Sequence, residues 1–201
     1  KRKNFTALIF TSHELPLAVL EDYTRYGQIV CCENPGQHHI SAVYSNREPA
    51  YLAAFNYLKS LEVQQIGLLL SRNLAKSPTW VAVTGAYHQV FHQKPDQQLM
   101  IGGMRSFEDG YRAAEQLIAR QPALNCYFTN GDDIAAGVRQ YHLDHQLPVP
   151  ILIGQEKQLS SLLLKMPTID HHFFTLEQKA FELALSNQHH ECAFESEFIR
   201  P

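Results

Sequence analysis

The chain has 201 residues, 45% of them hydrophobic, which is enough for a buried core in one domain or in two small lobes. Its formal net charge of −3 and isoelectric point near 6.4 argue against a chain built mainly to hold nucleic acid. No apolar run approaches the ~20 residues of a membrane span. The basic start leads into a short apolar run at residues 7–10, which predicts a strand and not a signal peptide.

The four cysteines show no spacing typical of a metal site. Cys31 and Cys32 are adjacent, and Cys126 and Cys192 lie in apolar contexts. This pattern predicts buried free thiols in a cytoplasmic protein.

Apolar runs of strand length alternate with segments that have apolar residues at helical spacing. In chain order, we expect a strand at 5–10, a helix at 15–26, strands at 28–32 and 43–44, a helix at 48–61, a strand at 66–70, a helix at 79–93, a strand at 99–101, a helix at 106–119, a strand at 125–128, a helix at 132–145, a strand at 151–153, a short helix at 158–164, an extended segment at 168–170, a helix at 176–185 and an extended segment at 193–199. This alternation predicts βαβ units and a mostly parallel sheet with helices on its faces, an α/β fold.

The run 129–138, Thr-Asn-Gly-Asp-Asp-Ile-Ala-Ala-Gly-Val, is the most informative local signal. Its Asn and Gly favour a turn, and Asp132 is a good residue for a helix N-cap. Ala135 and Gly137 would let the helix lie close to neighbouring backbone. Ligands of open α/β sheets bind outside the carboxyl ends of strands, where this run lies. Upstream, Ser106 and Asp109 are spaced as in a capping box.

Four segments together resemble the effector-binding domain of the LacI/GalR family of transcriptional regulators. They are ISAVYSNREPAYLAAFNYLKSLEVQQIGLL at 40–69, SFEDGYRAAEQLIARQPALNCYFTNGDDIAAGV at 106–138, LPVPILIGQE at 147–156 and PTIDHHFFTLEQKAFELAL at 167–185. They occur in the family's order and cover most of residues 5–190.

The resemblance implies a two-lobed fold like that of periplasmic binding proteins, with three chain crossings between lobes and a small molecule in the cleft. Residues 1–45 and 172–191 would form an N-terminal lobe, and 46–171 and 192–201 a C-terminal lobe. The family's helix-turn-helix domain and the first elements of its N-terminal lobe have no counterpart here. We therefore expect an incomplete N-terminal lobe with exposed sheet edge and apolar surface.

The implied function is sensing of a sugar or related molecule by a cytoplasmic repressor. Operator DNA would be bound only through the domain without a counterpart here, and the whole protein would be a homodimer. The expected dimer surface carries the helices at 48–61 and 158–164. No cofactor and no metal is implied.

Seven positions match places where family members hold the effector. Glu33, Glu156 and His171 follow predicted strands, and Lys76 lies in the loop before the helix at 79–93. The full set is Glu33, Lys76, Met104, Arg105, Asp132, Glu156 and His171. We expect Glu33, Lys76 and Glu156 to line one cleft. For Asp132 a helix-capping role competes with ligand contact, and for His171 a packed or solvent-facing role does.

The helix at 79–93 departs from the family pattern. Ala82 stands where the family has an effector-binding Arg, and Lys76 would replace it only in part, since Lys lacks the bidentate fork of Arg. Trp80 could supply a stacking face or belong to the core or an interface.

Catalytic motifs are missing from the sequence. It contains no HExxH, Cys-x-x-Cys, GxSxG, Walker loop or GxGxxG. The histidine pairs are adjacent, so their side chains diverge, which disfavours a shared metal. Two further hypotheses stay open beside the regulator: a sugar-binding protein of a transport system, and an enzyme of a related α/β class.

Overall fold

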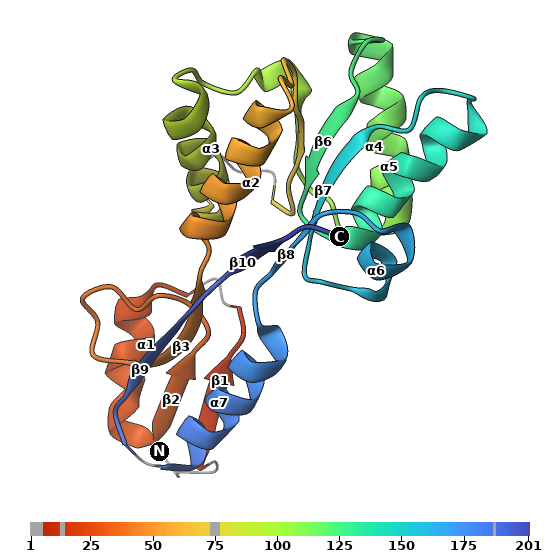
Figure 1. Ribbon diagram of the computed structural model, residues 1–201. Coiled ribbons are helices and arrows are strands. Elements are labelled where there is room, and N and C mark those ends of the chain that lie inside the picture. The colour runs from red at the N-terminus through yellow and green to blue at the C-terminus, as the bar shows by residue number, and fades with distance from the viewer. Residues whose placement is uncertain (1–5, 13–14, 73–76, 187) are drawn as a thin grey trace. The chain divides into compact units, whose positions relative to one another are not determined.

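The computed structural model describes residues 6–12, 15–72, 77–186 and 188–201 (Figure 1). The chain forms two compact units. The first comprises Lys1–Asn46 and His172–Glu195, and the second comprises Arg47–His171 and Ser196–Pro201. Both are parallel or mostly parallel sheets flanked by helices, so the predicted α/β class is confirmed.

The first unit is built on a four-stranded parallel sheet in the order β1-β2-β3-β9. Its strands are β1 (Ala7–Phe10), β2 (Gln28–Cys31), β3 (Ser41–Asn46) and β9 (Glu191–Glu195). Successive side chains of a strand point to opposite faces, so each face has its own core. The helix α1 (Leu17–Tyr23), followed by the short helix η1 (Thr24–Tyr26), contributes Leu20 to one face. The helix α7 (Phe173–Ser186) contributes Leu176, Ala180 and Leu183 to the other.

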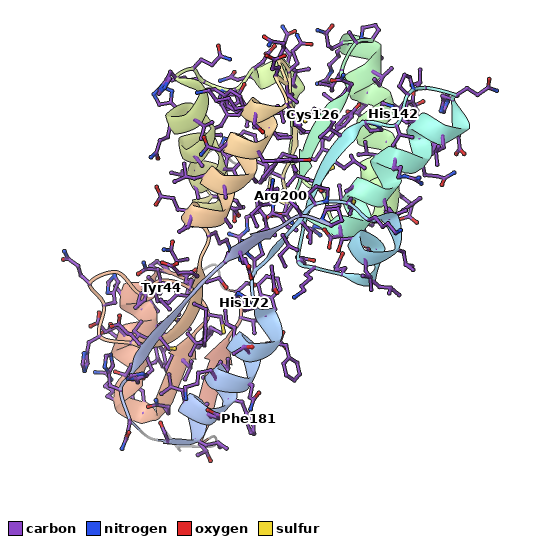
Figure 2. All side chains as sticks on the ribbon, viewed as in Figure 1. Tyr44, Cys126, His142, His172, Phe181 and Arg200 are labelled. Carbon is purple, nitrogen blue, oxygen red and sulfur yellow. The ribbon has the colours of Figure 1, made fainter. Side chains whose placement is uncertain are left out.

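The strand β1 lies at the edge of this sheet. Among the described residues it pairs only with β2, and Leu8 and Ile9 are 37% and 39% exposed. The helix α7 also exposes large apolar side chains, among them Phe174 at 81% and Phe181 at 60% (Figure 2).

The second unit is built on a six-stranded sheet in the order β10-β8-β7-β6-β4-β5. Its strands are β4 (Gly67–Leu69), β5 (Met100–Ile101), β6 (Cys126–Thr129), β7 (Ile151–Gln155), β8 (Thr168–Asp170) and β10 (Glu197–Ile199). All neighbours are parallel except β10, which runs antiparallel to β8.

Helices cover both faces of this sheet (Figure 1). On one face, α2 (Glu48–Ser60) and α3 (Pro78–Phe91) pack on Leu68, Cys126 and Phe128. On the other face, α4 (Phe107–Arg120) and α5 (Asp132–Asp144) pack on Leu69 and Tyr127. Two short helices, η2 (Gln97–Leu99) and α6 (Leu159–Leu164), complete the unit. None of the described helices is long and apolar enough to span a bilayer.

The C-terminal segment differs from the prediction. The extended run expected at 193–199 is two strands separated by the buried Ser196: β9 pairs with β3 in the first unit, and β10 pairs with β8 in the second. Residues 192–195, which the predicted division assigns to the second lobe, therefore lie in the first unit. The sequence pattern shows an extended run but not where the chain changes sheets.

All four cysteines are free thiols. Cys126 is buried on β6 (Figure 2), and burial raises its thiol pKa far above the ordinary value of 9.0. Burial also raises the pKa of the Cys31 thiol, and it raises that of the half-buried Cys32 to about 11.

Glycines permit a very close approach of α4 and α5. A Cβ added at Gly137 would overlap the Phe107 carbonyl oxygen, and one added at Gly110 would overlap the Ile134 carbonyl oxygen. The predicted close approach at Gly137 is confirmed. The capping box at the start of α4 is confirmed as well, because the Ser106 hydroxyl accepts from the Asp109 N–H and the Asp109 carboxylate accepts from the Ser106 N–H.

This packing predicts opposite outcomes for two glycine substitutions. Gly137→Ala should destabilise the chain by ~2 kcal/mol or more, because the obstacle is backbone that cannot yield without moving a helix. Gly85→Ala, in a helix where an added Cβ meets nothing within 4 Å, should be neutral or stabilise by up to ~1 kcal/mol. Urea denaturation followed by circular dichroism measures both, and equal midpoints for the two variants would contradict the packing argument.

Candidate functional site

Polar side chains gather where three neighbouring parallel strands of the second unit end. Asp132 follows β6, Glu156 follows β7 and His171 follows β8, and these strands are adjacent in the sheet. The carboxyl ends of parallel strands meet at one edge, where open α/β sheets bind ligands. We refer to this group, with its hydrogen-bonding partners, as the carboxyl-edge site.

The Asp132 carboxylate is fully buried and forms hydrogen bonds with two other segments. One carboxylate oxygen accepts a hydrogen bond from the Thr168 hydroxyl at 2.6 Å, and the other accepts from the Gln158 N–H at 2.6 Å. Space for this carboxylate exists because residue 154 is glycine, where a Cβ would collide with it. Burial raises the pKa of Asp132 above 3.8, and the hydrogen bonds from Thr168 and Gln158 oppose that rise.

The predicted N-cap role of Asp132 is wrong. The N-cap of α5 is Gly131, and Asp132 is the first residue inside the helix. Its carboxylate points to β8 and to the loop after β7 instead of to the backbone of its own helix. An acidic group at the first turn still benefits from the positive potential of the helix N-terminus.

Glu156 is half-buried in the loop after β7. Its backbone lies in the left-handed region, with φ of 86°, and the following Lys157 has φ of 51°. The loop is fixed at both residues: the Glu156 N–H donates to the Ile169 carbonyl at 2.7 Å, and Lys157 forms an ion pair of 2.9 Å with Asp170. Two successive non-glycine residues in this conformation indicate a strained turn.

The pKa of Glu156 is raised above 4.5. Burial is the main cause and the negative charge of Asp132 adds to it, while the positive charge of Arg47 acts in the opposite direction. Two acidic groups with raised pKa at one sheet edge mark a candidate functional site.

Gln158 joins the two carboxylates and was not predicted as a site residue. Its backbone N–H donates to Asp132, and its side-chain amide donates to the Glu156 carboxylate at 2.8 Å. Its side-chain oxygen accepts from the Asp133 N–H at 3.2 Å. No sequence pattern marks a loop glutamine for this role, because the role depends on the folded turn.

His171 belongs to a buried hydrogen-bond network. Its Nε2 contacts the Gln155 side-chain oxygen at 2.9 Å and its Nδ1 contacts the Ser196 hydroxyl at 2.8 Å. Gln155 donates its amide to the Thr129 carbonyl at 2.8 Å, so its oxygen must accept from His171 Nε2–H and from the Tyr51 hydroxyl. His171 is 2% exposed. Its side chain is therefore packed in the interior, which was the expected alternative to ligand contact.

The other predicted positions lie in different surroundings. Met104 is 8% exposed and packs in the core with α4 and α5, so it is a core residue in this structure. Arg105 is exposed, and its backbone N–H donates to Asp109 at 2.9 Å. Glu33 is half-buried after β2 in the first unit. Lys76 lies outside the described residues, so the expected grouping of Glu33, Lys76 and Glu156 stays a prediction.

Ala82 and Trp80, on α3, are half-buried and pack against the core that α2 and α3 share. In the described ranges, no group of three or more His, Cys, Asp or Glu side chains has a geometry suited to a metal ion.

Comparison with known proteins gives one curated relative and many similar structures. Catabolite control protein B of Bacillus subtilis (strain 168) is 27% identical over 198 residues, which cover 98% of this chain and 63% of that protein. A LacI family transcriptional regulator from Lactobacillus casei with bound sucrose has a TM-score of 0.84 at 17% identity, over 98% of this chain and 79% of that one. One from Enterococcus faecium with bound ribose has a TM-score of 0.76 at 20% identity, over 96% and 77% of the two chains.

The chain has the fold of a LacI-family effector-binding domain. The family resemblance predicted from the four sequence segments is thereby confirmed. No family model matches the sequence. The chain spans 63% of the length of the curated relative that it matches.

Glu156 allows a test through the pH dependence of stability. Between pH 4.5 and its raised folded-state pKa, the folded chain keeps a proton that the unfolded chain has lost. The stabilising effect of this group is therefore fully present below pH 4.5 and is lost as the pH rises through the folded-state pKa. We expect the free energy of unfolding of Glu156→Gln, relative to wild type, to increase as the pH rises from ~4.5 to ~7.5 in urea denaturation.

Glu115→Gln removes one negative charge from an exposed position on α4 and is the matched control. A stability difference between wild type and Glu156→Gln that stays constant with pH, or that falls, would contradict a raised pKa.

Proposed function

We propose that this chain is the effector-sensing part of a LacI-type transcriptional regulator and that its effector is a sugar or a related polyhydroxylated molecule. The similarity to catabolite control protein B over 98% of the chain is the observation that carries the proposal. Similar structures that hold sucrose, glucose and ribose support the effector class. All these neighbours are regulators, which favours a regulator over a sugar-binding transport protein and over an enzyme.

The chemistry of the carboxyl-edge site suits a hydroxylated ligand. A carboxylate accepts hydrogen bonds from hydroxyl groups, and sugar sites combine such acceptors with an apolar face. Glu156 is the best-placed acceptor, because it is only half-buried, whereas both oxygens of the fully buried Asp132 already accept hydrogen bonds. We assign ligand contact to Glu156 and a positioning role to Asp132.

The remaining polar candidates have different proposed roles. Arg105 is an exposed donor that could contact a ligand, and Glu33 and Lys76 stay candidates by the family resemblance. His171 acts by positioning, because Gln155 and Ser196 occupy its ring nitrogens.

Sensing would act through the turn after β7. A ligand that forms a hydrogen bond with the Glu156 carboxylate competes with the side-chain amide of Gln158. The backbone N–H of Gln158, which is the N-cap residue of α6, donates to Asp132. The ligand therefore alters the hydrogen bonds that fix α6 against α5. Operator DNA would be bound by another part of the regulator, in keeping with the net charge of −3 of these residues.

A thermal-shift screen tests the effector class. Sucrose, glucose, ribose and cellobiose are titrated against the chain, and at least one should raise the melting temperature. A ligand at ~100 times its dissociation constant adds ~2.7 kcal/mol to the free energy of unfolding. Glu156→Gln should weaken the active sugar by ~1–3 kcal/mol in calorimetry, because a hydrogen bond to a charged acceptor is lost.

Glu115→Gln, with the same loss of charge at an exposed site on α4, should bind the active sugar as wild type does. Unchanged affinity in Glu156→Gln would remove Glu156 from the ligand contacts. Failure of all hydroxylated ligands tested on the intact regulator would reject the effector class.

We also propose that the intact regulator is a homodimer that uses the surface around α2 and α6. The helix α6 exposes three leucines, Leu159 at 68%, Leu162 at 73% and Leu163 at 71%. Exposed apolar clusters of this kind are typical of interfaces. Two-fold operators require paired DNA-binding domains, which a dimer provides.

The dimer proposal predicts that Leu162→Glu lowers the dimer fraction of the intact regulator in sedimentation velocity, because a buried charge without a partner is costly. Val149→Glu, which places the same charge at a 54% exposed position of the loop before β7, should leave the dimer intact. A wild-type regulator that is monomeric at micromolar concentration and still binds its operator would refute the dimer.

A further inference from the structure

A groove runs along α3 of the second unit, and the proposed sensing site does not use it. One wall is the helix, with Trp80, Gly85 and His88, and the other is the segment that leads into β5, with Lys94, Pro95 and Met100. Its volume is about 640 Å³. Small-molecule sites in proteins fall in the range of roughly 300–1,000 Å³.

The groove follows from the spacing of residues on α3. Trp80, Thr84 and His88 are four residues apart and form one strip of the helix about 12 Å long. The helix buries a different strip, with Val83, Ala86, Tyr87 and Val90, in the core. Gly85 lies in the groove strip, and the space where its side chain would stand is open, with nothing within 4 Å.

Among the described residues, none of the side chains of the carboxyl-edge site lines the groove. Met100 is the first residue of β5, so the groove reaches the amino end of the edge strand of the sheet. Asp132 and Glu156 follow the carboxyl ends of β6 and β7. A ligand could therefore occupy the groove without contacting either carboxylate.

The side chains of the groove favour an aromatic ring with a negative charge. The indole of Trp80, the ring of Pro95 and the thioether of Met100 offer contacts to a flat apolar ring. Lys94 and His88 are the groove's titratable groups, and within the described ranges no acidic side chain lines it.

Both basic side chains are available to a ligand. Neither the Lys94 ammonium nor the His88 imidazole has a hydrogen bond or ion pair in the part of the chain that the structure describes. The nearby Asp96 carboxylate accepts from the Gln98 N–H at 2.9 Å, so it is engaged at the start of η2.

We propose that this groove binds a small planar aromatic anion, such as an aromatic carboxylate, with its ring against Trp80 and its carboxylate at Lys94. The site is independent of the sugar effector and of its contacts at Glu156.

Trp80 is the single tryptophan of the chain, so its fluorescence reports on the groove directly. We would titrate the 201-residue chain with 2-naphthoate as the probe, follow Trp80 emission, and confirm the affinity by calorimetry. We expect saturable binding, with at least about threefold weaker binding of the neutral isostere 2-naphthamide, in keeping with a charge contact near the surface. Lys94→Gln should abolish this difference between the two probes.

Gly85→Leu places a side chain in the groove at a position where the added Cβ meets nothing within 4 Å, and it should remove binding of both probes. Ala119→Leu adds the same side chain at an exposed position of α4 and should bind as wild type does. Circular dichroism and melting temperature check that both variants fold. A saturating sugar effector should leave naphthoate affinity unchanged.

Three results would overturn the proposal. These are absence of saturable naphthoate binding, equal affinity of the two probes for wild type, and naphthoate binding by Gly85→Leu at wild-type affinity. Loss of sugar sensing with retained naphthoate binding would instead count against the proposed function alone.

Discussion

The buried carboxylate of Asp132 is the interaction on which the carboxyl-edge site depends. It joins three segments that are distant in sequence, since α5 supplies the carboxylate, β8 supplies the Thr168 hydroxyl and the loop after β7 supplies the Gln158 N–H. Gly154 provides the necessary space. A buried carboxylate is tolerated only with such partners, because an unpaired buried charge costs several kcal/mol, on the order of 3–5. The position of Glu156 follows from this arrangement, because Gln158 connects the two acidic side chains.

A second polar network lies beneath the first and fixes the strand from which Glu156 extends. Gln155, the last residue of β7, receives hydrogen bonds from Tyr51 on α2 and from His171, and it donates to Thr129 on β6. Each of these buried groups is satisfied, as polar groups in native cores generally are. Glu156, the proposed ligand contact, is thus held by two sets of hydrogen bonds, a condition that favours a defined binding geometry.

Much of the fold could be predicted from the sequence, because strand and helix periodicities are strong in this chain. The capping box at Ser106 could be predicted because it depends on residues that are close in sequence. The close approach at Gly137 could be predicted because it depends on the absence of a side chain. Other features, such as the hydrogen-bond partners of Asp132, depend on tertiary contacts between elements distant in sequence. Aspartate is a residue type favoured at N-caps. The Asp132 carboxylate instead accepts hydrogen bonds from Thr168 and Gln158, and Gly131 is the N-cap of α5.

The candidate site was predictable only in part. The rule that ligands gather at carboxyl ends of parallel strands indicated Asp132 and Glu156, and the family resemblance added His171; the structure has all three at one sheet edge. The rule does not say which side chains stay open to a ligand. Met104 and His171 are buried, and Gln158 enters the site through the geometry of a strained turn. Such distinctions depend on the packing of neighbouring elements, which a single sequence does not encode locally.

The state of the cysteines bears on how the chain withstands oxidants. Only the thiolate form attacks a disulfide or a peroxide, so reactivity follows the ionised fraction. With a pKa of about 11, the Cys32 thiol is ionised to only ~1 part in 10,000 at neutral pH. Cys31 and Cys126 are shielded further by burial. Exchange of these three thiols with glutathione should therefore be slow.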